Sequence, residues 1–515
     1  MELQWPPSFQ VLFTFLLFII MVVNIATRSK AKYSASKNLP PGPWKLPVIG
    51  NLHQLVGSLP HHVLRDLANK YGPLMHLKLG EVSTIVVSSP EIAKEVMKTH
   101  DVVFASRPQI LATAIMTYGC TSVSFAPYGD YWRQLRKIYA HELLSKMRVQ
   151  SYRSVREDEV LNLIKRISLK TGSTVNLTSE IYSSTYSISY RAAFGKRSKD
   201  LENFIHCVKE SMKLASGFNL ADVFPSVKLL HLLSGMKPKL ERLHKEADRI
   251  MENIINEHKE DKTSTKVLEG EAEEDLLDVL LKFHEHGGGL EFSLTTENIK
   301  AVIIEIFGGG GETSSTTVDW AMSEMIKNPR IMKMAQNEVR EVFNRKGIAD
   351  ETSNGEMKYL DLVIKETLRL HPSNPLLLPR ECSERCEIDG YEIPVKTKVV
   401  INAWAIATDP SYWTEPESFT PERFLDSSID YRGLNFEYIP FGAGRRICPG
   451  ISFGLANVKL QLAMLLYHFD WKLPKGMKHD DLDMTEAFGV TSSRKQDLHL
   501  IPIPYHHPPT EKAQV

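Results

Sequence analysis

The segment 441–450 carries the residues whose chemistry is most specific in this chain. It reads Phe-Gly-Ala-Gly-Arg-Arg-Ile-Cys-Pro-Gly and places one cysteine, Cys448, on a glycine-rich loop beside two arginines. The apolar pattern that follows, from Ile451 to about Leu466, predicts a helix that begins just after the cysteine. The positive end of a helix dipole favours a thiolate at that place. The spacing therefore predicts a thiolate ligand for a metal ion.

Iron in a haem group suits this loop. Gly442, Gly444 and Gly450 let the backbone approach a metal and aim N–H groups at the sulfur. Arg446 can pair with a haem propionate, and a cysteine axial ligand is typical of haem enzymes that split dioxygen. The alternative is that Cys448 is one of five free cysteines that pack as small buried hydrophobes. The neighbouring glycines and arginines favour the ligand.

Five positions of the loop carry a family resemblance. Phe441, Gly444, Arg446, Cys448 and Gly450 match the haem-binding signature of the cytochrome P450 superfamily, so the chain resembles these haem-thiolate monooxygenases. The resemblance implies haem b with Cys448 as the iron ligand. It implies a mainly α fold with small β-sheets, in which the haem lies between a long central helix and the cysteine loop. It also implies electrons from NADPH through a separate NADPH–cytochrome P450 reductase, since the chain shows no NADPH or flavin motif.

The long central helix is predicted at residues 295–327. Its middle holds Gly308–Gly311, and each glycine costs up to ~1 kcal/mol of helix stability relative to alanine, so a functional reason is expected. The segment is similar to the oxygen-activation motif of the family, in which Glu312 and Thr313 would relay protons and the glycines would leave room for dioxygen and substrate. Gly309 stands where alanine is more usual. An exposed loop is the alternative, which the apolar flanks disfavour, and Glu312 and Thr313 do not fit a phosphate loop or a dinucleotide fingerprint.

Further residues match the family by position. Trp132 and Arg136 lie four apart, so on a helix both side chains reach the same anion. They match the family's helix that contacts a haem propionate, and Arg380 resembles a third propionate contact.

A second set resembles a structural network. Glu366 and Arg369 lie three apart and would form an ordinary helix salt bridge in isolation. In the family, Glu366, Arg369 and Arg423 would form a buried ion network that supports the haem loop and takes no part in the reaction.

Composition bounds the remaining possibilities. The 515 residues contain 62 basic and 62 acidic side chains, so no overall field attracts nucleic acid, and none is expected as a partner. Five cysteines are an odd number in a long chain, which fits a reducing compartment. Cys382 and Cys386 would make half a zinc site, but no second pair accompanies them.

The N-terminus predicts a membrane attachment. Residues 1–27 are expected to be a retained anchor, because the apolar run Phe9 to Ala26 can just span a bilayer and the positive cluster follows it. Residues 28–47 are expected to form a basic and proline-rich hinge, and residues 48–515 the haem-thiolate catalytic domain. The positive-inside rule predicts that the segment after the anchor is cytosolic. The resemblance to microsomal members of the family implies a single-pass protein of the endoplasmic reticulum membrane.

Periodicity predicts the elements that position these residues. Strand-like pieces occur at 74–79, 83–87, 387–393 and 398–402. Helical patterns dominate elsewhere, at 89–100, 131–145, 240–259, 275–284, 295–327, 330–344 and 358–370.

The substrate is predicted only by analogy. The sequence around residues 402–406, Asn-Ala-Trp-Ala-Ile, and the loop 441–450 resemble those of the A-type plant group and its branch of terpenoid and alkaloid hydroxylases. This resemblance implies a small hydrophobic substrate together with dioxygen. A sesquiterpene or diterpene is the first expectation, and an indole alkaloid or phenylpropanoid is the second. A haem-thiolate isomerase or dehydratase is a further alternative, which would not need the acid and threonine pair. By family position the pocket includes Ile115, Ile303, Phe307, Gly309, Leu376, Leu377, Phe488 and Val490.

Overall fold

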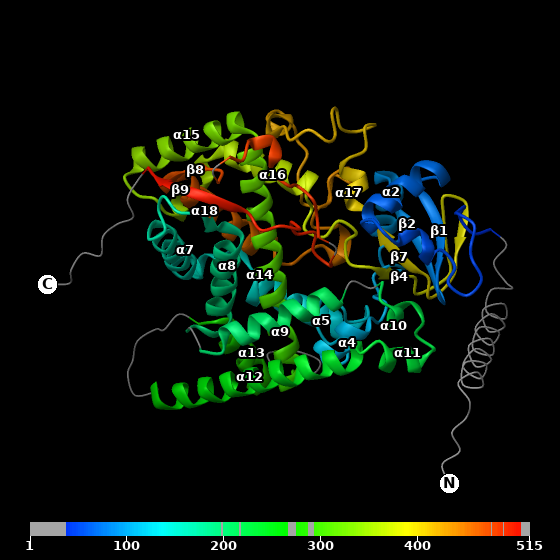
Figure 1. Ribbon diagram of the computed structural model, residues 1–515. Helices are drawn as coiled ribbons and strands as arrows, with labels where there is room; N and C mark the ends of the chain where they lie inside the picture. The colour runs from blue at the N-terminus through cyan, green and yellow to red at the C-terminus, as the bar shows by residue number, and fades with distance from the viewer. Residues whose placement is uncertain are drawn as a thin grey trace, which may run out of the picture.

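The computed structural model describes residues 38–196, 199–215, 218–265, 274–286, 293–474, 476–487 and 489–505. Within these ranges the chain is mainly helical with small sheets, which confirms that part of the predicted fold class (Figure 1). The helices are α2 (Pro60–Tyr71), α3 (Pro90–Lys94), α4 (Leu111–Met116), α5 (Asp130–Ile138), α6 (Lys146–Ser151), α7 (Arg153–Ser168), α8 (Leu177–Phe194), α9 (Leu201–Leu214), α10 (Leu220–Val223), α11 (Lys228–Leu233), α12 (Met236–Thr265), α13 (Leu276–His286), α14 (Thr296–Lys327), α15 (Pro329–Lys346), α16 (Lys358–Leu370), α17 (Ala403–Ala407) and α18 (Ile451–His468).

The largest described sheet is mixed and lies to one side of the helices (Figure 1). Its strand order is β1 (Leu74–Leu79), β2 (Val82–Val87), β7 (Lys398–Ile401) and β4 (Arg380–Glu381). β2 and β7 run parallel, and the other neighbours run antiparallel. A second sheet contains β3 (Val175–Asn176), β9 (His499–Pro504) and β8 (Phe469–Lys472), and a third is the hairpin of β5 (Cys386–Ile388) and β6 (Tyr391–Ile393). The stretch 387–393 turns back on itself because Asp389 and Gly390 both adopt positive φ.

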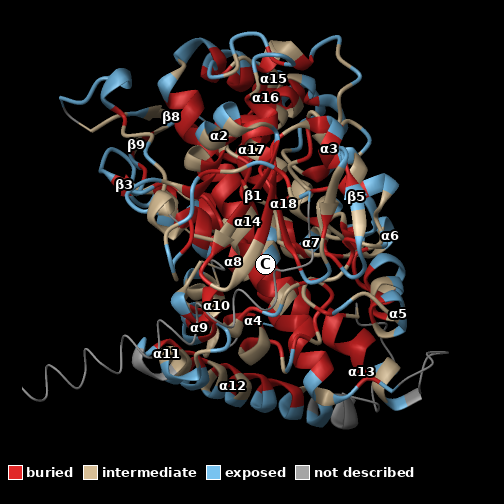
Figure 2. Ribbon diagram, turned by 90° about the vertical axis from the view of Figure 1, so that its right-hand side faces the viewer, coloured by how far each residue is buried: buried red, intermediate tan, exposed pale blue. Residues whose placement is uncertain are grey.

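Helix α14 forms the centre of the molecule. Thr295 caps its start, since its hydroxyl accepts the Asn298 N–H at 3.2 Å and the Asn298 side chain accepts the Thr295 N–H at 3.0 Å. Most residues of α14 are buried, as Figure 2 shows for the middle of the fold. A helix that is apolar on all sides is stable only when other elements cover every face. Helices α8, α16 and α18 supply that cover.

Helix α8 is the main element that periodicity did not indicate. Its sequence is rich in Ser, Thr and Tyr and shows little amphipathic pattern, yet most of it is buried against α14. Several of the hydroxyls are satisfied locally or across the interface: Thr185 donates to Ile181 O at 2.9 Å, and the Tyr182 hydroxyl lies 3.0 Å from that of Thr316. Buried hydroxyls with partners cost little, so a polar sequence can form a core helix.

The end of the proline-rich segment lies against the sheet. The His76 N–H of β1 donates to Pro41 O at 2.8 Å, and the Asn38 side chain donates to Gly390 O at 2.6 Å. A Cβ at Gly42 would lie 2.1 Å from His76 O, so only glycine permits this approach. Residues 38–47 therefore belong to the packed body, whereas residues 28–37 of the predicted hinge lie outside the described residues.

The predicted anchor, residues 1–27, also lies outside the described residues. Within the described ranges, no helix combines the length and the hydropathy that crossing a membrane requires.

Candidate active site

A cavity of about 420 Å³ lies between α14 and the loop that precedes α18. Cys448 lines it on the loop side, and Gly309 and Thr313 line it on the α14 side. The structure describes all five cysteines, and of these only Cys448 lines the cavity. The predicted thiolate and the predicted oxygen-activation segment therefore share one site.

Backbone contacts fix the cysteine loop. The Cys448 N–H donates to Phe441 O at 3.0 Å, and the Gly450 N–H donates to the Cys448 sulfur at 3.3 Å. Gly444 has φ +69°, and a Cβ there would lie 2.0 Å from Met97 O. The glycine at 444 is thus required by packing and does not line the cavity, whereas Gly450 and Phe441 do. The sulfur lies where the N-terminus of α18 begins.

The predicted electrostatics of Cys448 need a correction. The sequence pattern predicted surroundings that favour the thiolate, but burial is the largest effect and raises the pKa of the Cys448 thiol. The Gly450 N–H and Arg136 act in the opposite sense without offsetting burial. A bound metal cation overcomes this cost, because a thiol that coordinates a metal is deprotonated outright.

Four arginines line the same cavity: Arg107, Arg136, Arg380 and Arg446. They donate mainly to backbone carbonyls, such as Arg446 to Val123 O at 2.8 Å and Arg136 to Ile447 O at 2.6 Å. Burial first, and then neighbouring Arg380, lower the pKa of Arg446 to about 9. Burial also lowers the pKa of Arg380 to about 10. Both values lie above neutral pH, so these arginines stay charged. The cavity wall therefore carries more positive than negative charge.

This donor set fits haem. Among the described residues near these arginines, the carboxylates are Glu305 on α14 and Asp101, which lies 3.6 Å from Arg380. Buried cations are costly unless anions neutralise them. The two propionates of a haem would supply that charge, while Cys448 would hold the iron. Arg107 belongs to this group although no sequence motif pointed to it.

Trp132 takes a supporting position on α5. Its indole N–H donates to Val123 O at 2.8 Å, and its contact with a haem propionate stays a prediction. The Arg446 guanidinium lies over the Trp132 ring at 4.4 Å from its centroid. Trp132 lines the cavity beside Arg136, and its packing orients the Arg446 side chain.

The two predicted catalytic residues face different directions. The Thr313 hydroxyl donates to Gly309 O at 2.7 Å, and the residue lines the cavity. Glu312 does not line it. Its carboxylate accepts the Tyr186 hydroxyl at 2.7 Å and the Thr491 hydroxyl at 3.5 Å. Consecutive helical residues point about 100° apart, which explains the separation. Thr491 does line the cavity, so it connects Glu312 to the site.

The glycines of α14 have different surroundings. A Cβ at Gly309 would meet no atom within 4 Å, so this position opens on the cavity. A Cβ at Gly308 would lie 3.0 Å from Val208, and one at Gly311 would lie 2.5 Å from the Tyr186 ring. Gly308 and Gly311 therefore permit close helix packing, and Gly309 alone among these three provides free space.

Three of the eight predicted pocket residues do not line the cavity. Gly309, Leu376, Leu377 and Val490 line the cavity, and Phe488 lies outside the described residues. Ile115, Ile303 and Phe307 do not line it.

The orientation of each helix about its own axis explains why these three residues do not line the cavity. On α4, Ala112, Thr113 and Met116 face the cavity, which turns Ile115 to the other side. On α14, Ile304 and Gly308 face it, while Phe307 packs against Phe204 with ring centroids 4.7 Å apart.

Glu305 is a cavity residue that no motif identified. Its carboxylate accepts the Ser124 N–H at 2.7 Å and the Tyr139 hydroxyl at 3.1 Å, and burial raises its pKa. A single acid within the apolar run 301–307 is the sequence signal that could have identified it.

The three residues of the predicted ion network contact one another, and none of them lines the cavity. Glu366 accepts from Arg369 Nε at 2.7 Å and from Arg423 Nε at 2.9 Å, and Glu366 and Arg369 are fully buried. Arg369 also donates to Ala407 O at 2.9 Å and to Pro416 O at 2.7 Å. These contacts hold the segment after α17 against α16.

Comparisons with known proteins place this geometry in a family. Residues 40–499 match the family model described as Cytochrome P450. Premnaspirodiene oxygenase of Hyoscyamus muticus is 55% identical over 96% of this chain and 97% of its own length. Tabersonine 16-hydroxylase 2 of Catharanthus roseus is 55% identical over the same shares, 96% and 97%. A solved zebra fish cytochrome P450 structure with abiraterone has a TM-score of 0.73 and 25% identity, and the match covers 87% of this chain and 99% of that one.

The match spans the segment from the proline-rich stretch to β9, and it includes both walls of the cavity. Members of this family use haem with a cysteine thiolate ligand, and Cys448 is the cysteine placed to supply it. The chain therefore belongs to the cytochrome P450 family and is an oxidoreductase of the monooxygenase class.

Proposed function

We propose that this monooxygenase hydroxylates a hydrophobic plant specialised metabolite, with a sesquiterpene or diterpene as the first substrate class. The observation that carries the proposal is the apolar wall of the cavity that Cys448 and Thr313 share. Most of that wall is contributed by apolar side chains such as Met116, Val208, Met212, Ile304, Leu376 and Val490. Apolar walls with few polar groups are typical of sites for small hydrophobic ligands.

The residues of the chain have separate tasks in this proposal. When bound at Cys448, haem supplies the activation of dioxygen with electrons that originate from NADPH. Arg136, Arg380 and Arg446 hold the cofactor through its propionates. The apolar wall excludes water from the substrate side. Thr313 holds a proton at its Oγ1 beside the open face at Gly309, and Glu312 reaches the cavity through the Thr491 hydroxyl.

The proposal includes the cellular setting. We place the chain in the endoplasmic reticulum membrane through residues 1–27, with residues 48–515 in the cytosol, and we assign electron delivery to a separate NADPH–cytochrome P450 reductase. The apolar run Phe9 to Ala26 and the lysines and arginine that follow it support this arrangement.

The test is product analysis by mass spectrometry. Membranes that contain this chain and a plant reductase receive NADPH and a panel of terpenes, indole alkaloids and phenylpropanoids. We expect a terpene product one oxygen heavier that is absent with Cys448→Ala. An alkaloid product alone would replace the substrate class, and the relative named for tabersonine makes this the second candidate. A product formed from a hydroperoxide without NADPH would overturn the proposed hydroxylation in favour of an isomerase or dehydratase.

A further inference from the structure

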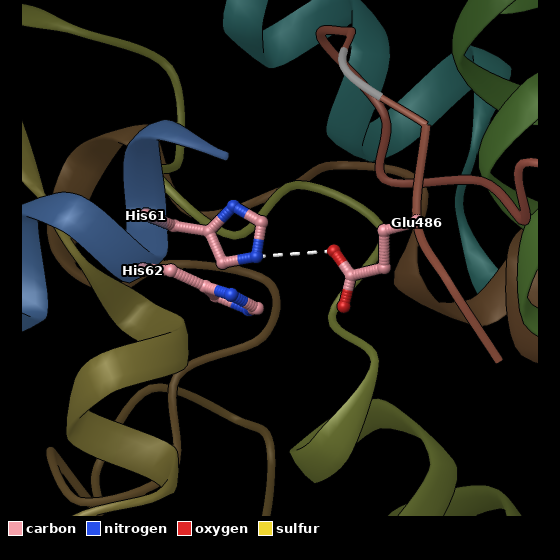
Figure 3. Close-up of side chains that lie close together, drawn as sticks. All are labelled: His61, His62 and Glu486. Atoms are coloured by element: carbon pink, nitrogen blue, oxygen red, sulfur yellow. Dashed lines mark ion pairs between the residues drawn. The ribbon is translucent and has the colours of Figure 1, made fainter. Parts of the chain in front are cut away.

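Two histidines and a glutamate converge outside the haem site. His61 and His62 lie on α2, and Glu486 lies on the C-terminal segment before β9. Figure 3 shows both imidazoles projecting toward the carboxylate. His61 Nε2 lies 3.0 Å from Glu486 Oε2, and one possible ligand atom of each of the three residues lies within 4.8 Å of the other two.

The donor atoms are buried and only partly satisfied. The side chains of His61 and Glu486 are 4% and 11% exposed. The Nε2 atoms of both histidines are buried; that of His61 faces Glu486, whereas that of His62 has no hydrogen-bond partner within the described part of the chain. The contact with Glu486 satisfies the Nε2 atom of His61, but no such contact satisfies that of His62. A buried ring nitrogen without a partner is costly, so it indicates a ligand that the protein atoms do not supply.

The surrounding residues hold the three side chains in place. The Trp404 ring stacks on His62 with centroids 4.3 Å apart, and it meets His61 edge-on at 5.0 Å. The Ser492 hydroxyl donates to Glu486 Oε2. Such contacts orient the imidazoles and the carboxylate before any ligand binds, as outer contacts do in known metal sites.

We propose that His61, His62 and Glu486 form a binding site for a divalent metal ion, with Zn²⁺ as the ion that suits them best. Zinc prefers imidazole nitrogen and carboxylate oxygen at about 2.0–2.2 Å in a tetrahedral arrangement, which separates neighbouring ligands by about 3.3 Å. The 3.0 Å between His61 Nε2 and Glu486 Oε2 is close to that separation. Three protein ligands leave the fourth position for water.

The site joins two segments at the edge of the substrate cavity. His61 itself lines the cavity, as do Leu59 and Pro60 at the start of α2. Ala487 and Ser492, which lie close to Glu486 in sequence, also line it. A metal bound by all three residues would fix α2 to the C-terminal segment. Zinc is therefore expected to stabilise the fold and to change the KM for the substrate more than kcat.

The test is equilibrium dialysis of the purified haem-loaded protein against buffered Zn²⁺, with zinc counted per haem. We expect one saturable zinc per haem. His62→Gln removes a ligand at a half-buried position and should raise Kd by about 100-fold or more, because loss of outer contacts alone costs 10- to 100-fold. Glu486→Gln should act similarly. His499→Gln, at an exposed histidine, and Cys386→Ser, at a partly exposed thiol, are the matched controls and should bind as the wild type does.

Thermal unfolding gives a second readout. Zinc should raise Tm in the wild-type protein and in the controls but not in His62→Gln. The absence of saturable binding would overturn the proposal. So would unchanged binding by His62→Gln, or binding that disappears with Cys386→Ser alone. If Glu486→Gln loads little haem, His62→Gln decides the question, since its ring takes no part in the ion pair.

Discussion

Glu305 and Ser124 join the central helix to the loop between α4 and α5. One Glu305 oxygen accepts the Ser124 N–H at 2.7 Å, and the other accepts the Tyr139 hydroxyl at 3.1 Å. These contacts hold a segment whose residues Ser122 to Phe125 all line the cavity. The shape of that side of the cavity therefore depends on one buried acid of α14.

Replacement of Glu305 tests this role. Glu305→Ala leaves the Ser124 N–H without its acceptor and should lower the free energy of unfolding by about 1–3 kcal/mol. Glu305→Gln keeps an acceptor and should cost less than half as much. Substrate Kd, measured by optical titration, should rise in the alanine variant and recover in the glutamine variant. An equal effect of both variants would show that the charge matters more than the contact.

Alanine substitutions should distinguish the glycine of α14 that opens on the cavity from the glycine that permits close helix packing. Gly309→Ala adds a methyl where no atom lies within 4 Å, so it should raise helix stability by up to ~1 kcal/mol and reduce binding of the largest substrates. Gly311→Ala places a methyl 2.5 Å from the Tyr186 ring and should lower stability by about 1–3 kcal/mol. Denaturant unfolding of the haem-loaded variants measures both. The same sign for the two changes would contradict the packing assigned here.

The Glu366 network should be essential for folding. Glu366→Ala leaves Arg369 and Arg423 as unpaired charges, one of them fully buried, and should cost ~3–5 kcal/mol and give little haem-loaded protein. The control is Glu241→Ala at the exposed pair with Lys237, which should change stability by less than about 1 kcal/mol. Haem content per chain and urea unfolding are the measurements. Normal haem content in Glu366→Ala would refute the role.

Thr313 and Glu312 should have distinguishable effects. Thr313→Ala removes the hydroxyl that lines the cavity, so NADPH consumption should continue while peroxide replaces product. Thr313→Ser should restore product formation. Glu312→Gln should lower kcat by about 10²-fold or more, as loss of an acid in proton transfer does, without the same peroxide release. Unchanged product per NADPH in Thr313→Ala would remove it from the proton path.

Asp319 should make stability depend on pH. Burial is the largest effect on this α14 carboxyl and raises its pKa to about 6. The Thr178 hydroxyl donates to the Asp319 carboxylate at 2.7 Å. A carboxyl whose folded pKa lies above its unfolded pKa favours the folded state most when protonated. Its contribution is therefore present at low pH and is lost as pH rises through about 6.

The variant Asp319→Asn keeps the acceptor for Thr178 and removes the titration. Its stability relative to the wild-type protein should increase by about 1 kcal/mol between pH 5 and pH 7.5. Urea unfolding at the two pH values measures this difference. A constant difference would show that Asp319 does not titrate in this range.

Local patterns predicted many elements of the fold. The strand at 74–79 and the helix at 358–370 have the bounds that their periodicity indicated, because side-chain spacing reports which face of an element is buried. Helix α8 was not indicated, since its buried face includes many hydroxyl-bearing residues that break the apolar periodicity. The pairing of β8 with β9 depends on chain segments that only meet in the folded protein.

For the site, the sequence by itself determined the cysteine loop, the glycine segment of α14 and the family, because these depend on residue types at fixed spacing. Only the tertiary structure decided which face of α14 meets the cavity, and so placed Gly309 and Thr313 inside and Phe307 and Glu312 outside. It also decided the contacts of Glu305 with Ser124 and of His61 with Glu486. Helix rotation and long-range contacts arise from the packing of the whole chain, and no local pattern encodes them.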